Sequence, residues 1–194
     1  MPINSASRLT RSIAVCVAAI VAAGCERREQ AHQPGASANS GKIEITSTAF
    51  NDGGAIPPEH TCQGKDSSPA LKWSGLPNQT RSIAVTCDDP DAPGGAWVHW
   101  VLYNVPAATG GLGAAIATTA SLPDGSAQGK NDFGRIGYGG PCPPAGPAHH
   151  YYFRVYALDT DLAFKSGATK RELEDAMRGH VVAEGALIGT YARR

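Results

Sequence analysis

The sequence predicts a mainly β domain with long loops, and three observations support this. The 194 residues include 23 glycines and 14 prolines, which interrupt helices. Segments rich in β-branched and aromatic residues recur, the clearest being Trp97–Val105 and Tyr151–Leu158. Outside the N-terminal region, a helix-start signal with helical spacing is best developed near residues 170–179. With 42% hydrophobic and 18% charged residues, the chain is too apolar to be disordered, and its length suits one domain and a tail.

The charge balance argues against a nucleic-acid-binding protein. The chain holds 17 basic and 17 acidic residues, so its net charge is zero. A protein that binds a phosphate backbone without sequence preference needs a broad basic surface. We therefore expect no nucleic-acid partner.

The first residues have the pattern of an export signal. Two arginines precede an apolar run at positions 13–23, which is too short for the roughly 20 residues that span a bilayer. The run leads into Val-Ala-Ala-Gly-Cys, which resembles a bacterial lipobox, although Ala22 stands where that motif usually has Leu. We expect residues 1–24 to be a lipoprotein signal peptide and Cys25 to be lipidated after cleavage. An ordinary signal peptide that happens to contain a cysteine is the alternative.

A polar segment separates this signal from the domain. Residues 26–41 are polar, contain Gly, Pro, Ser and Ala, and have no apolar period. We expect residues 25–41 to be a flexible tether behind the lipid anchor, followed by a single domain at 42–194. The predicted location is the periplasmic side of a bacterial cell envelope, with Cys25 anchoring the protein to a membrane.

The first half of the domain carries short strand signals separated by turn residues. Lys42–Thr46 alternates between polar and apolar residues, as in a half-buried strand. Residues 51–58 hold a cluster of Asn, Asp, Gly and Pro that indicates turns. Leu71–Trp73 is a short apolar segment, and Ser82–Cys87 is a nearly continuous apolar run typical of a buried strand.

The second half combines two strong strands with a long irregular region. Trp97–Val105 and Tyr151–Leu158 are aromatic and β-branched, so both are predicted to be strands. Residues 106–148 hold many glycines and prolines and are predicted to be long loops, which in compact domains are commonly functional. Residues 181–191 are predicted to be partly a strand.

One helix is predicted near residues 170–179. Thr169 and Glu172 match a capping box, in which each side chain satisfies a backbone N–H at the helix start. Leu173 and Met177 follow at helical spacing, so they are expected to face the core.

The first segment with chemical potential is Asp88-Asp89-Pro90-Asp91-Ala92-Pro93, directly after a predicted strand. The prolines fix the backbone and remove two N–H donors, which stiffens the loop. We expect the loop to hold one carboxylate inward while the others face water. A turn with local Asx-type hydrogen bonds is the alternative.

The second such segment is Gly137–His149, directly before a predicted strand. Its glycines allow backbone N–H groups to approach a ligand closely, and consecutive N–H groups can bind an anion. No Gly-Lys-Ser/Thr sequence follows, so the segment is not a P-loop. A rigid connector is the alternative.

Two histidine positions lie near these segments. In a regular strand, His99 would share its face with Trp97 and Val101. His149 and His150 are adjacent, so they would point to opposite faces, and only one of them would join His99 in one pocket. A histidine on an apolar face is most often a satisfied core residue. The same alternation predicts the other face of the strand for Val98, Trp100 and Leu102.

Taken together, these motifs resemble the phosphatidylethanolamine-binding protein family, also called Raf kinase inhibitor-like proteins, in its bacterial branch. The resemblance covers nearly all of residues 42–194. The segments that carry it are Thr61–Gly64, Ser68–Trp73, Asp88–Pro93, His99–Trp100, Asn131–Gly134, Gly139–Pro144, Tyr156–Asp159 and Gly189–Tyr191.

The resemblance implies a sandwich of two antiparallel β-sheets with a few peripheral helices, and a small pocket for phosphate-like anions. It implies a non-catalytic binding protein whose ligand is a small anion or a phospholipid head group, with modulation or inhibition of a partner protein as a further role. No cofactor is expected. The pocket residues implied by motif position are Asp89, Asp91, Pro93, His99, Gly140, Pro141, His149 and Tyr151.

Within that pocket, we expect Asp89 to orient an imidazole and both His99 and His149 to act as hydrogen-bond donors when protonated. His150 stands where the family usually has Arg. If that arginine forms an ion pair beside the pocket, the pairing here is weaker or pH-dependent, because imidazole is mostly neutral above about pH 6.5.

Two other classes of site remain open at this point. A hydrolase would need a nucleophile, for which Cys142 and Cys87 are candidates, or it would depend on histidine in the same pocket. A metal site of the two-histidine, one-carboxylate kind would use Asp89, His99 and His149, although their spacing is not diagnostic.

The resemblance also bears on the cysteines of the domain. It places Cys62 and Cys142 in loops near one face, so these two are expected to form a disulfide in an exported protein. Cys87 is then expected to be a free thiol buried in its strand.

Overall fold

The computed structural model describes residues 41–164 and 166–193. The predicted signal peptide, the lipidation site at Cys25 and nearly all of the tether lie outside the described residues. Among the described residues, none of the helices combines the length and apolarity needed to cross a membrane.

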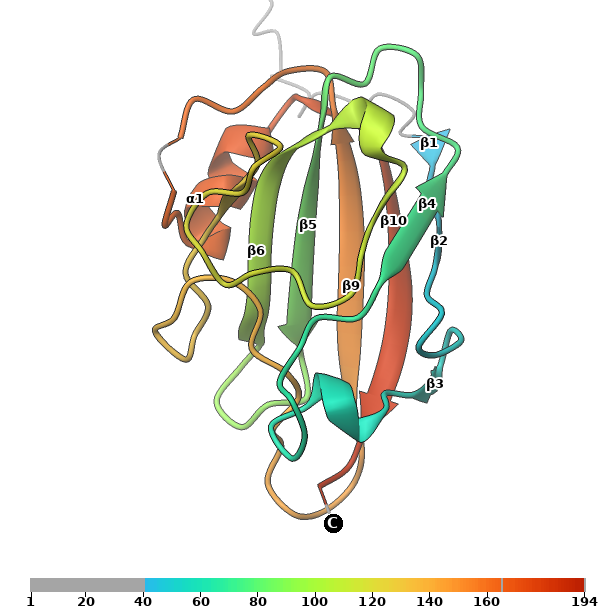
Figure 1. Cartoon of the computed structure of the whole chain (residues 1–194), viewed down its shortest axis with the longest axis vertical. Coiled ribbons are helices and arrows are strands. Elements are labelled where there is room, and N and C mark those ends of the chain that lie inside the picture. The colour runs from blue at the N-terminus through green and yellow to red at the C-terminus, as the bar shows by residue number, and fades with distance from the viewer. Residues whose placement is uncertain (1–40, 165, 194) are drawn as a thin grey trace, which may run out of the picture. The chain divides into compact units, whose positions relative to one another are not determined.

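The described chain forms two β-sheets with little helix, which confirms the predicted fold class (Figure 1). The large sheet has seven strands in the order β1-β10-β9-β5-β6-β8, with β3 also paired to β10. Its strands are β1 Gly41–Lys42, β3 Gly54–Ala55, β5 Ser82–Asp89, β6 Trp97–Pro106, β8 Ala127–Gln128, β9 His149–Leu158 and β10 Val181–Tyr191. The small sheet, in the order β2-β4-β7, contains β2 Glu44–Thr46, β4 Leu71–Ser74 and β7 Gly111–Leu112.

The pairing is antiparallel except at one edge. The four long strands β10, β9, β5 and β6 are antiparallel neighbours. The short strands β1 and β3 pair in parallel with β10. These two contacts add to the antiparallel sandwich and protect the edge of β10.

Two core layers lie on the two faces of the large sheet. The main core, between the sheets, includes Ile45 and Trp73 from the small sheet and Phe153 from β9. The second core lies under helix α1, Lys170–Met177, whose Leu173 and Met177 are buried. The predicted capping box is present, because Thr169 Oγ1 accepts the Glu172 N–H and Glu172 accepts the Thr169 N–H. The two short 3₁₀ turns are η1 Pro58–His60 and η2 Ala107–Thr109.

Several predicted elements differ in extent from the observed ones, and two of the differences concern the ends of the domain. The single strand predicted at Lys42–Thr46 is divided at Ile43, because β1 pairs with the large sheet and β2 with the small one. Residues 181–191, predicted to be partly a strand, form β10 throughout. In the predicted loop region 106–148, β6 ends at Pro106, and the other regular elements are β7, β8 and a 3₁₀ turn.

The three aspartates after Cys87 do not divide as expected. Asp88 and Asp89 are both buried, each 3% exposed, and only Asp91 is at the surface. The reason is that β5 continues through Asp89, so the two aspartates alternate between the faces of the sheet. Asp88 faces α1, where its Oδ2 accepts hydrogen bonds from Arg154 at 2.8 Å and Lys170 at 3.1 Å.

Candidate functional site

A β-bulge in β6 sets the direction of His99. Cys87 pairs with Trp100 and Asp88 pairs with Val98, so His99 is an extra residue in its strand. Trp100 belongs to the main core, and the His99 ring lies 5.1 Å from the ring of Tyr151 in the same core. His99 and Trp100 therefore share a face, as expected of a bulge that redirects side chains.

The bulge overturns part of the alternation predicted for this strand. Trp97 lies on the His99 side and Val98 on the opposite side, as expected. Beyond the bulge the order is reversed, because Val101 packs under α1 while Trp100 and Leu102 join the main core.

The His99 ring is buried and anchored at one nitrogen. Its Nδ1–H donates to the carbonyl oxygen of Gly139 at 2.6 Å, whereas Nε2 is buried without a hydrogen-bond partner. Burial lowers the pKa of His99, and this effect exceeds the opposing influence of the Gly139 carbonyl and Asp89. The neutral ring therefore predominates at neutral pH, with the Nε2 lone pair available as an acceptor.

Asp89 orients the second imidazole. Its Oδ2 accepts a hydrogen bond from Nδ1 of His149 at 2.8 Å, and its Oδ1 accepts one from the Asp91 N–H at 2.9 Å. Both side chains are largely buried, with 4% of Asp89 and 13% of His149 exposed. The contact brings the Asp89 carboxylate to one of the two imidazoles, as an orienting role would require.

His150 points to the other side of β9 and bonds to Asp91. Its ring and its backbone N–H both donate to Oδ2 of Asp91, at 2.7 and 2.8 Å. These hydrogen bonds lower the pKa of Asp91. The histidine that replaces the usual arginine thus pairs with a carboxylate beside the site, and the pair is solvent-exposed.

One cavity of about 300 Å³ collects these side chains at the end of the sandwich where β5 ends and β6 and β9 begin (Figure 1). Of the predicted residues, it is lined by Asp89, Pro93, His99 and His149. The cavity lining does not include the other four predicted residues, which are Asp91, Gly140, Pro141 and Tyr151. The cavity is also lined by six residues that were not predicted to bind a ligand, namely Ala92, Trp97, Phe133, Cys142, Pro143 and Pro144.

Phe133 is the most informative of the missed residues. Its ring makes edge contacts with Trp97 at 5.4 Å and with His99 at 5.3 Å. The segment Asn131–Gly134 belongs to the family resemblance, but nothing in its residue types indicated a position at a pocket. Apart from the imidazoles and Asp89, the lining is mostly apolar.

Tyr151 packs against His99 beside the cavity. Burial, followed by the nearby Asp89 carboxylate, raises the pKa of Tyr151 far above its usual range. The phenol therefore stays protonated, and its ring supports the edge of His99.

The cysteines remove one of the alternatives. Cys62 and Cys142 form a disulfide with Cα atoms 5.4 Å apart, and Cys87 is a buried free thiol. Burial, reinforced by Asp88 and Asp89, raises the pKa of the Cys87 thiol. Because thiolate is the nucleophilic form, neither candidate cysteine is suited to attack a substrate.

The three side chains considered for a metal site, Asp89, His99 and His149, are not arranged as metal ligands. No group of three or more His, Cys, Asp or Glu side chains in the described part of the chain is arranged to hold a metal ion. The nitrogen of His99 that faces Gly139 and the nitrogen of His149 that faces Asp89 are each engaged by protein atoms.

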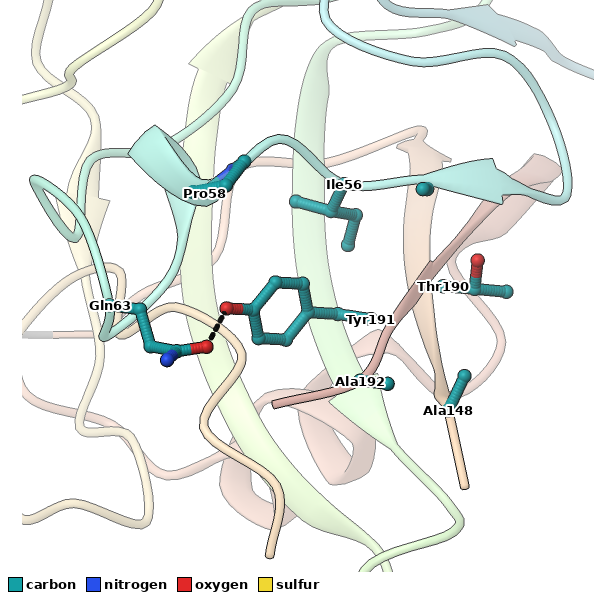
Figure 2. A pocket seen from close by; sticks show the side chains of 8 residues that line it. Ile56, Pro58, Gln63, Ala148, Thr190, Tyr191 and Ala192 are labelled. Carbon is teal, nitrogen blue, oxygen red and sulfur yellow. Dashed lines mark hydrogen bonds between the residues drawn. The ribbon is translucent and has the colours of Figure 1, made fainter. Parts of the chain in front are cut away.

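A second cavity of about 550 Å³ lies beside the segment that leads into β9 (Figure 2). Tyr191 and Gln63 point toward one another across it, and the Tyr191 hydroxyl donates to Oε1 of Gln63. Ala148 lines this cavity, while the next residue, His149, lines the first. Its lining contains no imidazole or carboxylate.

The fold and the site together define a two-sheet β domain with an imidazole-lined cavity at one end. A family model described as "Phosphatidylethanolamine-binding protein" matches residues 46–192. The chain therefore belongs to the phosphatidylethanolamine-binding protein family, as the sequence motifs indicated.

Relatives and solved structures agree with this assignment. A "UPF0098 protein" of Methanothermobacter thermautotrophicus is 50% identical over 151 residues, covering 78% of this chain and 99% of the relative. A putative phosphatidylethanolamine-binding protein homologue of Chlamydia trachomatis matches with a TM-score of 0.72 and 38% identity, over 80% of this chain and 100% of that one. YbcL of E. coli, titled a new member of the mammalian PEBP family, matches with a TM-score of 0.73 and 36% identity, over 79% of this chain and 99% of that one.

Proposed function

We propose that the cavity between His99 and His149 binds a small oxyanion of the phosphate type, either free or as a phospholipid head group. The supporting observation is that two imidazoles from different strands line one cavity of about 300 Å³ whose other walls are mostly apolar. A cavity of this size with few polar groups suits a small ligand. Membership of a family named for a phospholipid supports the same ligand class.

The carboxylate at the cavity is compatible with an anionic ligand. Asp89 would repel an anion if its charge were free, but both of its oxygens accept hydrogen bonds. When His149 is protonated, its Nδ1–H stays bonded to Asp89 and its Nε2–H is a donor for the ligand. In that state the charges of the imidazolium and of the Asp89 carboxylate offset each other, and the pair presents a donor.

The state of His99 makes the binding pH-dependent. In the neutral ring, Nε2 accepts a hydrogen bond, so it suits an oxyanion that still carries a proton, such as dihydrogen phosphate or hydrogen phosphate. Protonation of His99 turns Nε2 into a donor and adds a positive charge. Because burial lowers the pKa of His99, this second state is reached only in acid. We therefore expect affinity for phosphate to increase as the pH falls below 6.5.

Calorimetric titration of the full chain with phosphate and with phosphoethanolamine tests the proposal. The variants are His99→Ala and His149→Ala, and the matched control is His180→Ala, whose ring bonds to the exposed Asp159 at 2.8 Å. We expect a loss of about tenfold or more in the first two, since a hydrogen bond to a charged group is worth about 1.5–3 kcal/mol. The control should bind like the wild type.

Unchanged affinity in both cavity variants would contradict the proposal. Phosphate- and carboxyl-ester assays on the same proteins separate it from the alternative, a histidine-dependent hydrolase. Turnover that disappears in His149→Ala would favour the hydrolase.

The proposal extends to location and partners. An exported lipoprotein anchored through Cys25 would hold the domain near a membrane, and the Cys62–Cys142 disulfide suits an oxidising compartment. A phospholipid surface or a partner protein would meet the cavity at Trp97 and Phe133. These are the large apolar side chains that the described residues leave exposed.

A further inference from the structure

Asp66 lies outside the cavity lining but is linked to it through the backbone. Its Oδ1 accepts a hydrogen bond from the Gly140 N–H at 2.6 Å, and its Oδ2 lies 3.2 Å from Nη2 of Arg135. The φ angle of Asp66 is 55°, a left-handed conformation that Asp, Asn and Gly adopt more readily than other residues. Neither the sequence motifs nor the cavity lining assigns this residue a role.

One peptide group connects Asp66 to His99. The Gly140 N–H and the Gly139 carbonyl belong to the same planar peptide unit and point in opposite directions. The carbonyl accepts the hydrogen bond from Nδ1 of His99 at 2.6 Å, and the Gly139 N–H donates to the His99 carbonyl at 2.9 Å. Asp66 and His99 therefore hold this peptide from its two edges.

The close approach requires glycine at position 140. A Cβ atom there would lie 2.3 Å from the carbonyl oxygen of His60 and 2.8 Å from Oδ1 of Asp66. Any side chain at Gly140 would push the peptide away from the Asp66 carboxylate. This gives a physical reason for a glycine that the family resemblance placed at the pocket.

We propose that Asp66 is a positioning residue that fixes the tautomer of His99 through the Gly139–Gly140 peptide. A carboxylate that accepts the N–H polarises the peptide, which makes its carbonyl a stronger acceptor. A stronger acceptor at Gly139 holds the proton on Nδ1 of His99 and leaves the lone pair on Nε2 toward the ligand. The consequence for binding rests on the proposed function, whereas the tautomer is a property of the ligand-free protein.

Other contacts hold the same loop independently of Asp66. The Cys62–Cys142 disulfide joins the two segments, and the Cys62 N–H donates to the Pro141 carbonyl at 3.1 Å. The Tyr138 hydroxyl donates to the His60 carbonyl at 2.8 Å. We therefore expect the loop to keep its path when the Asp66 side chain is removed.

A matched pair of substitutions isolates the hydrogen-bond acceptor at position 66. Asp66→Gly and Asp66→Asn both suit the left-handed backbone, but only Asn retains an acceptor for the Gly140 N–H. The control is Asp161→Gly, which removes an exposed aspartate paired with Arg81 at 3.3 Å. Nitrogen-15 NMR of the full chain without ligand reports which ring nitrogen of His99 is protonated and how fast its proton exchanges with solvent.

We expect the wild type, Asp66→Asn and Asp161→Gly to keep the proton on Nδ1. In Asp66→Gly, the Nε2–H tautomer should gain population, and exchange of the Nδ1 proton should be roughly tenfold faster, because the Gly140 N–H has lost the acceptor that holds the Gly139–Gly140 peptide. A merely structural role would lower the Tm of Asp66→Gly but leave the tautomer unchanged. Wild-type tautomer and exchange in Asp66→Gly would overturn the proposal.

Phosphate titration of the same proteins separates this proposal from the proposed function. Affinity about tenfold weaker in Asp66→Gly, with near-wild-type affinity in Asp66→Asn, is expected. If the wild type itself does not bind phosphate, the proposed function fails, and the tautomer measurement still decides the role of Asp66.

A measurement on the wild type covers the case in which Asp66→Gly does not fold. If one peptide links the two contacts, the Gly140 N–H and the Nδ1 proton of His99 become exposed to exchange in the same opening event. Their native-state exchange should then give the same opening free energy. A His99 proton that stays protected while the Gly140 N–H exchanges freely would contradict the link.

Discussion

His99 shows how one residue decides which side chains meet at the cavity. Its strand is evident from the aromatic and β-branched residues of β6, but the extra residue at the bulge is not. The bulge depends on how β5 pairs with β6, a long-range property that local alternation does not encode. This is why the sequence predicted Trp97 on the correct face and Trp100 on the wrong one.

The buried state of His99 also makes stability depend on pH. Its folded pKa lies below the ordinary value of 6.5 because of burial, so the unfolded chain takes up a proton more readily. Stability from this group is complete above pH 6.5 and decreases as the pH falls from 6.5 to the folded pKa. We expect the free energy of unfolding, measured in urea at pH 7.5, 6.0 and 5.0, to decrease less with falling pH in His99→Gln than in the wild type.

The control for this measurement is His180→Gln, which removes an exposed imidazole. Because His99 is intact in this variant, its free energy of unfolding should decrease with falling pH as much as that of the wild type. Equal pH profiles for His99→Gln and the wild type would show that His99 titrates alike in the folded and unfolded chains.

At the scale of elements, the end of β5 serves both faces of the large sheet. Because side chains alternate between the faces of a strand, Asp89 faces the cavity and Asp88 faces the helix side. There, Arg154 and Lys170 offset the charge of Asp88. The sequence predicted both β5 and α1, and the capping box fixed the start of the helix. It did not predict the pairing, because the spacing of Asp88 and Lys170 gives no sign that α1 lies on the same face of the sheet as Asp88.

This pairing predicts an effect of Lys170→Met on stability. Desolvation is the largest single influence and disfavours the charged lysine, but Asp88 and Glu174 together outweigh it and raise the pKa of Lys170. Removing the cation leaves a buried carboxylate with Arg154 as its remaining cation, so we expect a loss of about 1–2 kcal/mol in chemical denaturation.

The comparison variant is Glu174→Gln, which removes the more exposed partner of Lys170. Its loss should be no more than about 0.5 kcal/mol, as for surface pairs on helices. Equal losses in the two variants would show that the contact with Asp88 contributes nothing specific.

At the scale of the whole molecule, the cavity is assembled from three segments far apart in sequence. They are the β5–β6 connection, the loop at Phe133 and the loop that contains Cys142. Residue types alone marked the first and third segments as candidates, and only the family resemblance predicted that His99 and His149 meet. Phe133 and Asp66 were not predicted, because their roles arise from tertiary contacts rather than from composition.

The predicted lipid anchor is a property of the full chain and has its own test. Cys25→Ser should lose incorporation of labelled palmitate and move from the membrane fraction to the soluble periplasmic fraction. Cys16→Ser, within the apolar run of the signal, should behave like the wild type. A wild-type protein that is soluble and unlabelled would support the ordinary signal peptide.

The most direct test of the account is a crystal of the domain soaked in phosphate at pH 5.5 and at pH 7.5. We predict density for a tetrahedral anion within hydrogen-bond distance of Nε2 of both His99 and His149, with higher occupancy at the lower pH. Side chains packed between the two rings, or an anion bound only elsewhere on the surface, would contradict it.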